Sequence, residues 1–500
     1  MNHHPRNFYP AIPQIKAIFF LCCMGLLVFY GTLHSPFHYD DAHAIVESPH
    51  IKDLNKFQER VGIQNVFNRS VLLLSFAVNQ HLGEMKVFGY HLVNILIHIL
   101  NSILWLFLVK GFLYIEPSKN RLLLKQLPLV CSIIHLVNPI NVQAVTYLSS
   151  RSSLLATFFY LLAFYIFLKI LKPSKERFAK IHTPIFAFSR LIFLFLGIAT
   201  KEIVASFPLI VVVYLWLATP NEKRKSLIPK FIFILFLFLV FMGYRYFEQG
   251  NLFSIKADPA STNTHHLLYL LSQIKVIVGY YILKLLAPFN LNFEPDIVLY
   301  SNWFHWDWVI SLTILLITGI IIFKQQSKLI KFGALWFLIT LLPTSSFIPL
   351  KQLATEHRTY LPGLGFSLVL GWVVLNIKNY QKMAKLFFLI FILLSSTLTL
   401  NRSLDFRSEV SLWEDTSLKS PRKALVHNNL ATAYMADDQL QKAKDALVTA
   451  LTINPSQTDS YINLGHIAGR EKNWEQAIEK FDLGISLGTQ KADTFYYSGF

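Results

Sequence analysis

Charged residues are scarce in this chain of 500 residues, at 15% against the roughly 25% of a soluble protein. Only three cysteines are present, all inside apolar runs and without the spacing of a metal site or disulfide framework: Cys22, Cys23 and Cys131. The sequence also lacks a glycine-rich phosphate loop, a nucleophile elbow and a Cys-x-x-Cys pair. These shortages exclude a set of soluble domains, a disulfide-rich secreted protein and a collagen-like or disordered chain.

Long apolar runs dominate the sequence, with 53% hydrophobic residues and a mean hydropathy of +0.43. Eleven runs come close to the ~20 residues that cross a bilayer, at 15–34, 91–110, 126–147, 152–170, 184–200, 202–219, 231–247, 306–323, 332–349, 360–377 and 385–401. The first run is long and lacks a small-residue cleavage site, which predicts a signal anchor and not a cleaved signal peptide. The sequence therefore predicts an all-α, polytopic membrane helix bundle of about eleven spans.

The basic residues give this bundle an orientation. The N-terminus and alternate loops hold 22 of the 46 Lys and Arg but only three of the 29 Asp and Glu. Loops rich in Lys and Arg stay in the cytoplasm, so the net charge of +17 reports topology and does not indicate a nucleic-acid partner. A further apolar stretch, 266–288, must then enter and leave on the outer face as a re-entrant or surface-lying helix. The C-terminal region is predicted to lie outside as well.

Beyond residue 401 the hydropathy falls and a 34-residue period appears, marked by Pro421 and Pro455. Small and large apolar residues recur at matching offsets, which is typical of the tetratricopeptide repeat, an α-solenoid of helix pairs. We therefore divide the chain into a membrane domain (1–401, with an outer catalytic loop at 34–90), a linker (402–420) and repeats at 421–454, 455–488 and, in part, 489–500. Such repeats bind extended peptides or mediate assembly.

The first outer loop carries two adjacent carboxylates, Asp40 and Asp41, just past a predicted span. One of them is suited to remove a proton from an acceptor hydroxyl, while the other holds a metal or orients the acceptor. A solvated turn is the alternative interpretation of the same pair. Farther along the loop, Arg69 precedes the apolar stretch 71–78, which predicts a short helix lying on the membrane surface.

Further ionisable residues stand at the outer ends of predicted spans, namely Arg151, Lys201, Glu202, Glu356, His357 and Arg358. Ionisable groups at membrane depth are costly and need partners, and cations gathered on one face suit an anionic phosphate. Snorkelling at the interface or structural ion pairs would explain each of these residues singly. By contrast, His91 and His98 share one helix face with Asn94 and Asn101, which predicts hydrogen bonds between helices and not a ligand pair.

Seven motifs follow one another along the chain and keep a consistent topological side: Tyr39-Asp40-Asp41 with Ala44-Ile45, Phe88-Gly89-Tyr90-His91-Leu92-Val93-Asn94, His135-Leu136-Val137-Asn138-Pro139, Ser150-Arg151-Ser152, Thr200-Lys201-Glu202, Leu342-Pro343-Thr344-Ser345-Ser346 and Glu356-His357-Arg358. With the repeats, they resemble the transmembrane and tetratricopeptide-repeat O-mannosyltransferase family and its bacterial relatives, within the C-type glycosyltransferase superfamily. The resemblance covers about residues 36–500. Two features depart from the family: the repeat array is short, and Asn68-Arg69-Ser70 stands where relatives often have an Arg-Pro pair.

The resemblance implies an inverting transferase that moves a sugar, mannose in the eukaryotic members, from a polyprenyl-phosphate carrier to an acceptor hydroxyl on a protein at the outer face. The resemblance implies that Asp40 and Asp41 are the catalytic carboxylates. The candidate donor-phosphate contacts are Arg151, Lys201, His357 and Arg358, with Glu202, Glu356 and Arg69 in support. The lipid-linked sugar is a co-substrate and no cofactor is implied. A monophosphate leaving group needs less neutralisation than a diphosphate, so we expect no obligatory metal.

Two other classes of protein remain as alternatives. A non-enzymatic membrane scaffold, whose repeats recruit outer-face proteins, would need neither Asp40 nor Asp41. A transporter would show internal symmetry and broken helices at mid-membrane, and the sequence shows neither. For the enzyme, the expected partners are the polyprenyl-phosphate sugar, a protein or peptide acceptor bound by the repeats, and membrane lipid. The lack of lumenal cysteines favours a bacterial inner membrane over the endoplasmic reticulum, with the repeats on the periplasmic or lumenal side.

Overall fold

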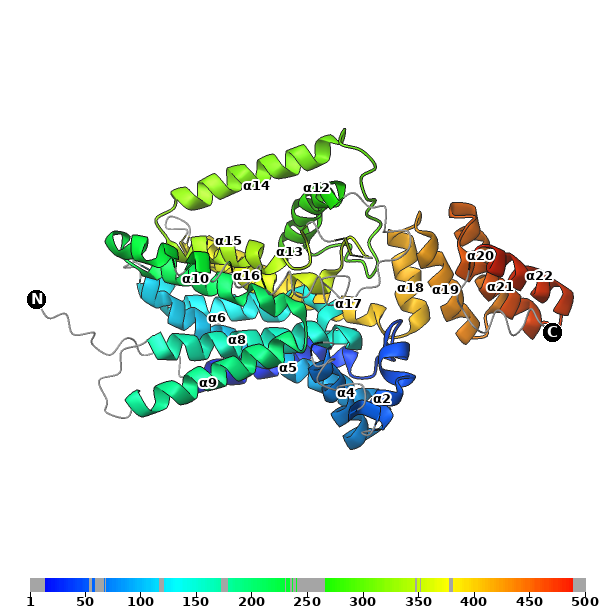
Figure 1. Cartoon of the computed structure of the whole chain (residues 1–500), viewed down its shortest axis with the longest axis horizontal. Helices are drawn as coiled ribbons and strands as arrows, with labels where there is room; N and C mark the ends of the chain where they lie inside the picture. Colours follow the sequence, from blue (N-terminus) through cyan, green and yellow to red (C-terminus); the bar gives the residue numbers. More distant parts are fainter. Residues whose placement is uncertain are drawn as a thin grey trace, which may run out of the picture. The chain divides into compact units, whose positions relative to one another are not determined.

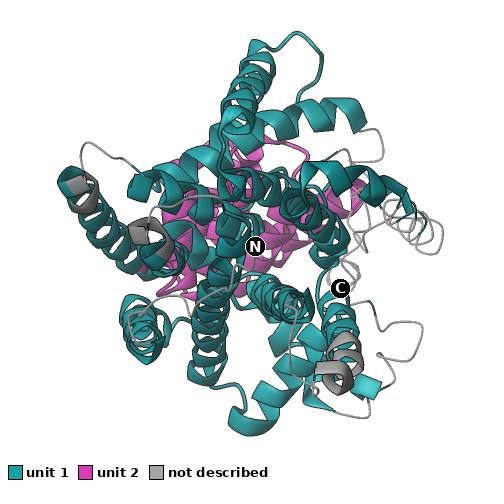
Figure 2. Ribbon diagram, turned by 90° about the vertical axis from the view of Figure 1, so that its left-hand side faces the viewer, with its two compact units in different colours: residues 1–291, 298–403 teal, residues 292–297, 404–500 magenta. Residues whose placement is uncertain are grey.

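The computed structural model describes residues 14–53, 56–58, 67, 69–116, 121–171, 179–229, 231–233, 236, 240, 266–346, 349–350, 352–376 and 381–488. These described residues form helices and no strand, which confirms the all-α prediction. They belong to two compact units, one of residues 1–291 and 298–403 and the other of residues 292–297 and 404–500 (Figure 2).

The first unit is a bundle of apolar helices. Its longer members are α1 (Gln14–Phe29), α4 (Ser70–Gly83), α5 (Val87–Phe112), α6 (Arg121–Val137), α8 (Arg151–Leu171), α9 (Ala179–Ile198), α10 (Phe207–Ala218), α12 (His266–Val276), α14 (Trp306–Lys324), α15 (Lys328–Leu341), α16 (Pro362–Asn376) and α17 (Gln381–Asp405). Short helices connect them, among them α2 (Pro49–Lys52), α7 (Val142–Thr146) and α13 (Leu283–Leu286). In Figure 1, α5, α6, α8 and α9 run alongside one another, and the pairs α5–α6, α5–α8 and α8–α9 are in contact.

Six described helical segments are long and apolar enough to cross a membrane: Gln14–Thr32, Val87–Ile115, Leu148–Leu171, His266–Leu286, Trp306–Lys324 and Leu386–Asp405. A seventh is the pair Lys125–Val137 and Pro139–Thr146, which is bent by 53°. Proline cannot donate a backbone hydrogen bond, so Pro139 explains the break. Shorter apolar helices cover three more predicted spans, while most of 234–247 lies outside the described residues. The chain is a polytopic membrane protein, and the count of eleven spans stays a prediction.

Aromatic residues fill the core of the bundle between α5, α8, α10, α15 and α16. Trp105, Phe112, Tyr160, Phe164 and Trp336 are all fully buried there. Phe112 meets the ring of Phe332 edge-on with the centroids 4.8 Å apart. Such pairs contribute about 1 kcal/mol beyond the burial of their surface.

Helices α15 and α16 approach closely at two glycines. A Cβ on Gly333 would lie 2.8 Å from the backbone oxygen of Gly365. Contacts between small residues are a usual way for membrane helices to pack, because lipid provides little hydrophobic driving force between helices. A side chain at either glycine would therefore push the two helices apart.

Helix α12 and α13 lie across the direction of the other helices in Figure 1 and are joined by a π-helical turn, Ile277–Ile282. The amide of Gln273 donates to the Leu353 carbonyl (2.9 Å), and Asn138 donates to the Leu285 carbonyl (3.4 Å). Leu353 lies in a turn that the charge pattern assigns to the outer face, whereas Asn138 lies at the break of the bent pair Lys125–Val137 and Pro139–Thr146. The contact with Leu353 agrees with the re-entrant prediction for 266–288. Because His266–Leu286 also has the length and hydropathy of a span, the re-entrant course stays a prediction.

The second unit consists of α18 (Glu409–Lys419), α19 (Ala424–Ala436), α20 (Leu440–Ile453), α21 (Thr458–Arg470) and α22 (Trp474–Ser486). Helix α19 packs on α20 and α21 packs on α22, so the helix pairs coincide with the predicted units 421–454 and 455–488. A Cβ on Gly465 would lie 2.6 Å from the ring of Phe481, where the first helix of a pair meets the second. The partial unit 489–500 lies outside the described residues. A tetratricopeptide solenoid remains our interpretation of these pairs.

The segment 402–420 differs from the expected linker, because α18 belongs to the second unit. Ser408 caps this helix: its hydroxyl accepts from the Ser411 N–H (3.0 Å), and its own N–H donates to the Ser411 hydroxyl (3.1 Å). Leu412 and Trp413 are buried, and the ring of Phe293 meets Trp413 edge-on at 5.5 Å. The residues that hold α18 therefore come partly from 292–297, more than a hundred positions earlier.

Candidate functional site

Asp41 is a fully buried carboxylate at the start of the first loop. Its oxygens accept hydrogen bonds from the His38 N–H (3.0 Å) and from the Ser149 N–H and hydroxyl (2.7 and 2.5 Å). Burial raises the pKa of Asp41 from 3.8 to about 6, and the hydrogen bonds from Ser149 and His38 oppose that rise. These three donors make Asp41 a fixed anchor for the loop.

Asp40, the neighbouring carboxylate, is exposed. The turn between the two acids begins at Tyr39, whose φ of 46° lies in the left-handed region. A residue other than glycine adopts that region only where its surroundings fix it. Tyr147 lies close by, since the charges of Asp41 and Asp40 add to burial in raising the pKa of its phenol. The chain thus presents one carboxylate outward beside one that is tied inward.

Arg151 is fully buried and its guanidinium donates to four residues. The acceptors are the side-chain oxygens of Asn94 (2.6 Å) and Asn79 (2.6 Å), the carbonyl of Tyr90 (2.9 Å) and, more weakly, the carbonyl of Ser75 (3.3 Å). Its charge also lies 4.5 Å from the centre of the Phe76 ring. Arg151 therefore ties α4 to α5 and α8, and its hydrogen bonds are used within the protein.

Three residues at or just before the start of α8 hold the predicted site together. Ser149 holds Asp41, Arg151 holds α4, and Ser153 accepts from the Lys201 ammonium (2.8 Å). The preceding helix α7 adds a fourth connection, since Gln143 accepts from the His357 N–H (3.0 Å). Motifs that are dispersed over more than 300 residues of sequence therefore converge on residues 143–153.

Four of the predicted basic residues form what we call the cation cluster, namely Arg69, Lys201, His357 and Arg358. The pKa of Lys201 is lowered from 10.5 to about 7, mainly by burial; the charge of Glu202 opposes this shift, and the charges of Arg69 and Arg358 contribute to it. Burial and the charges of Lys201, Arg358 and Arg69 likewise hold the pKa of His357 well below its usual range. The positive charges of Arg69, Lys201 and Arg358 thus gather around His357, and Glu202 offsets part of the charge on Lys201. A bound phosphate would supply a further anion to this group.

The two carboxylates predicted to support this region are placed differently. Glu202 is half-buried, and the described residues include no direct Lys201–Glu202 ion pair. Glu356 is fully buried; its carboxylate lies 3.8 Å from the Arg402 guanidinium and accepts from the Tyr280 hydroxyl (3.3 Å). Glu356 therefore joins the turn before His357 to α17 and to the helix 277–282.

Both histidines of α5 form hydrogen bonds with other segments of the bundle, and the predicted bond between helices is confirmed for His98. His91 meets the Ser35 carbonyl through Nε2 (2.8 Å). His98 meets the Leu136 carbonyl through Nε2 (3.1 Å) and the Tyr360 hydroxyl through Nδ1 (2.6 Å). Because a carbonyl only accepts, His98 carries its proton on Nε2 and accepts from Tyr360.

Within the described residues no three His, Cys, Asp or Glu side chains stand close enough to hold a metal ion. Sequence reasoning missed Tyr147, Ser153 and Arg402, which the structure places against Asp40, Lys201 and Glu356. Arg402 could have been found from the sequence, because an arginine directly follows the apolar run 385–401. The serine and the tyrosine gave no signal, because their roles depend on partners distant in sequence.

Sequence comparison finds relatives along most of the chain. It is 25% identical over 460 residues to a protein O-mannosyl-transferase of Caenorhabditis elegans, covering 88% of this chain and 63% of that protein. It is 23% identical over 528 residues to the protein O-mannosyl-transferase TMTC3 of Homo sapiens, covering 95% and 56%. The Tmtc3 protein of Drosophila melanogaster is 23% identical over 557 residues, covering 96% and 60%.

The chain spans about three fifths of the length of these curated relatives. No family model and no solved structure matches it. At 88 to 96% of the chain, the matched regions include residues of both compact units. Over most of its length the chain is therefore similar to proteins named protein O-mannosyl-transferases, TMTC3 among them.

Proposed function

We propose that this chain is an integral membrane glycosyltransferase that moves a mannose-like sugar from a polyprenyl-phosphate carrier to a hydroxyl of a protein at the outer face. One observation carries the proposal: the exposed carboxylate of Asp40 and the cation cluster are anchored to the same short stretch, 143–153, through Asp41, Lys201 and His357. A base and a phosphate site on one rigid platform are what sugar transfer from a lipid phosphate requires. The names of the relatives support the same reaction.

Asp40 acts as the general base in this proposal. As the acceptor oxygen bonds to C1 of the sugar, its proton passes to the Asp40 carboxylate. The bond between C1 and the phosphate oxygen breaks on the opposite face, and the polyprenyl phosphate leaves with the electron pair. A single displacement of this kind inverts the configuration at C1. Asp41 is buried and held by three donors, so its role is to position Asp40.

The cation cluster stabilises the departing phosphate. Negative charge grows on the leaving oxygen in the transition state, and preorganised cations near it lower the barrier. Lys201 and Arg358 are both largely buried, at 7% and 8% exposure, so their charges are poorly screened by water. Arg151 uses its donors to hold α4 and therefore positions the site from behind.

The helix pairs of the second unit bind the acceptor protein in this proposal. The face of such pairs accommodates an extended segment, and the relatives are named for protein acceptors. The free cysteines Cys22, Cys23 and Cys131 lie in α1 and α6, so the described outer segments contain none. This distribution favours a bacterial inner membrane with the second unit on the periplasmic side.

The proposal is tested with the purified full chain, a labelled polyprenyl-phosphate mannose and an outer-face protein acceptor. Asp40→Asn is expected to lower transfer at least 1,000-fold with unchanged thermal stability, since the removed carboxylate is exposed. Glu47→Gln, an exposed acid of the same loop that pairs with His43, serves as the matched control and is expected to retain transfer. Full transfer by Asp40→Asn would refute the assignment of the base.

A further inference from the structure

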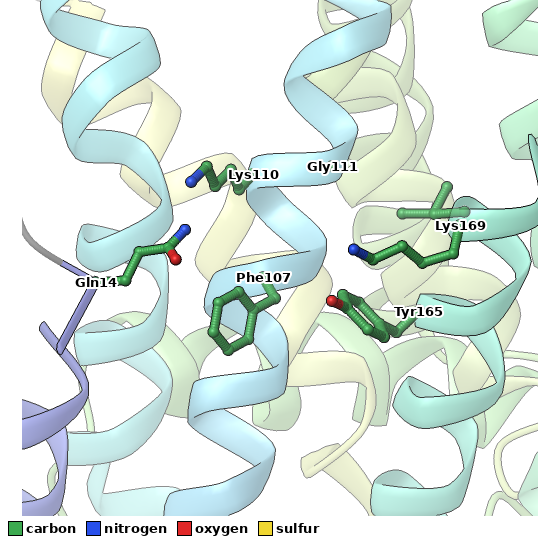
Figure 3. Close-up of a pocket in the computed structure, with 7 residues that line it drawn as sticks. Gln14, Phe107, Lys110, Gly111, Tyr165 and Lys169 are labelled. Atoms are coloured by element: carbon green, nitrogen blue, oxygen red, sulfur yellow. The ribbon is translucent and has the colours of Figure 1, made fainter. Parts of the chain in front are cut away.

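A cavity of about 240 Å³ opens between the ends of α1, α5 and α8 (Figure 3). Its lining includes Lys110 and Phe107 of α5, Tyr165 and Lys169 of α8, and Gln14 of α1. Lys169 follows Arg151 by 18 residues on one helix, which is about 27 Å of rise. The cavity therefore lies at the opposite end of the bundle from Asp41 and the cation cluster, about one bilayer core away.

The chemistry of this lining selects an anion. Lys110 and Lys169 are exposed, neither forms an ion pair with another described residue, and the lining contains no acid. The Lys169 ammonium lies 5.2 Å from the centre of the Tyr165 ring. In Figure 3 Lys169 and Tyr165 extend from α8 toward α5, while Lys110 leaves α5 on the side of Gln14. Two cations, an amide and a phenol thus surround one space.

The surroundings of the cavity match a lipid and not a soluble anion. Phe107 contributes an apolar wall, and beside the polar residues the chain exposes apolar side chains: Ile15 is 77%, Tyr114 84% and Leu171 44% exposed. At this depth such side chains contact acyl chains. The volume is about eight times the ~30 Å³ of a water molecule, which leaves room for a phosphate with its glycerol.

We propose that this cavity binds the phosphate of an anionic phospholipid, in the leaflet opposite the candidate active site. Lysines near the ends of α5 and α8 also complement the negative helix C-termini, but that role requires neither a cavity nor the donors of Gln14 and Tyr165. Basic pockets between membrane helices are suited to anionic head groups because the local dielectric is low and the acyl chains stay in lipid. The occupied cavity fastens α1 to α5 and α8.

The test measures lipid binding to the detergent-purified full chain by native mass spectrometry, with thermal unfolding as a second readout. Phosphatidylglycerol is expected to bind at least ten-fold more tightly than phosphatidylcholine and to raise the unfolding temperature. The double variant Lys110→Gln/Lys169→Gln is expected to lose both effects. Lys223→Gln/Lys324→Gln removes two other exposed lysines and is expected to keep them.

Three results would overturn the proposal. Equal binding of the two lipids would remove the anion selectivity, and selective binding that survives Lys110→Gln/Lys169→Gln would place the lipid elsewhere. Inorganic phosphate is added in a third arm. If millimolar phosphate displaced phosphatidylglycerol completely, the site would be one for a free anion and the lipid assignment would be wrong. Both lysines are exposed, so their substitution leaves the fold intact.

Discussion

Asp41 and Ser149 are 108 residues apart in sequence, yet one carboxylate oxygen of Asp41 accepts both the N–H and the hydroxyl of Ser149, at 2.7 and 2.5 Å. This contact fastens the loop that follows α1 to the start of α8, the helix that also holds Lys201 through Ser153. The two adjacent acids therefore have separate roles. Asp41 sets the place of the loop, and Asp40 faces outward.

The buried Asp41 predicts a pH-dependent stability. Its pKa in the folded chain, about 6, lies above the value of 3.8 expected when the chain unfolds, so the folded state binds the proton more tightly. Its contribution to stability is therefore fully present below about pH 4 and is lost as the pH rises through 6. Two pH units correspond to about 3 kcal/mol.

We expect the wild type to lose up to about 3 kcal/mol relative to Asp41→Asn between pH 4 and pH 7, because asparagine does not titrate. Denaturant unfolding in detergent at each pH measures this difference. Ser149→Ala removes one hydrogen bond to the carboxylate, so it is expected to move the transition to higher pH. Parallel stability curves for wild type and Asp41→Asn would contradict the prediction.

Arg151 is expected to act on stability and not on donor affinity. Arg151→Lys keeps the charge but loses the planar set of donors that meets Asn94, Asn79 and the Tyr90 carbonyl. We expect a loss of about 3 kcal/mol of unfolding free energy, since these are buried bonds to a charged group. Arg422→Lys, at an exposed site, is the matched control and is expected to be neutral.

The competing assignment of Arg151 to the donor phosphate makes the opposite prediction. In that case Arg151→Lys would raise the KM for the lipid-linked sugar and leave the unfolding temperature nearly unchanged. Measuring both quantities on the same preparation separates the two roles. A large rise in KM without destabilisation would return Arg151 to the phosphate site.

The sequence located the ionisable residues of the site but not the groups that hold them. Arg151 and Lys201 stand out because an ionised side chain in an apolar run is costly. Ser149 and Ser153 do not stand out, because a serine hydroxyl is common in membrane helices and its partner is set by the tertiary fold. The helical period predicts which side of α8 a residue occupies, but it does not predict which distant segment that residue contacts.

Helix α18 lies where the fall in hydropathy predicts a linker, at 402–420. Leu412, Trp413 and Thr416 nevertheless follow a helical period and are buried, and Ser408 with Ser411 forms a capping box. The insertion of 292–297 into the same unit was beyond sequence reasoning, because it depends on pairing across more than a hundred residues.

Lys201 predicts how donor binding depends on pH. Its pKa of about 7 means that the unliganded chain loses this charge between pH 6 and pH 8. A sugar phosphodiester carries one negative charge over that range, so its affinity follows the Lys201 ammonium. We expect the KM for the polyprenyl-phosphate sugar to rise by up to about ten-fold per pH unit above 7, with proton uptake on binding.

The control for this dependence is Lys201→Arg, since arginine stays charged throughout. The KM of Lys201→Arg is expected to be higher than that of the wild type at pH 6, because the planar guanidinium fits the contact with the Ser153 hydroxyl less well than the ammonium does. This KM is expected to stay constant up to pH 9. A wild-type KM that is constant from pH 6 to pH 9 would show that Lys201 does not contact the donor.

Two neighbouring ion pairs in the second unit offer a matched comparison. Lys423 lies 2.5 Å from Glu294, whose side chain is only 3% exposed, and Lys423 also donates to the Pro295 carbonyl (3.3 Å). Arg422 lies 3.4 Å from Asp296, but its own side chain is 83% exposed. Removing a cation from a buried carboxylate is costly, whereas exposed pairs contribute little. The two adjacent residues should therefore differ strongly.

Lys423→Met is expected to destabilise the second unit by about 2 kcal/mol, because Glu294 stays charged and largely buried but loses the Lys423 ammonium. Arg422→Met is expected to cost less than about 0.5 kcal/mol. Hydrogen exchange of the amides of α18 and α19 measures both, since the segment 292–297 packs on these helices through Phe293 and through the Asn292–Ser420 hydrogen bond (2.7 Å). The double variant Glu294→Gln/Lys423→Met should recover part of the loss, because the uncompensated charge is gone. Equal protection in Lys423→Met and Arg422→Met would mean that Glu294 finds water or another partner, and that the inserted segment is held by its apolar contacts alone.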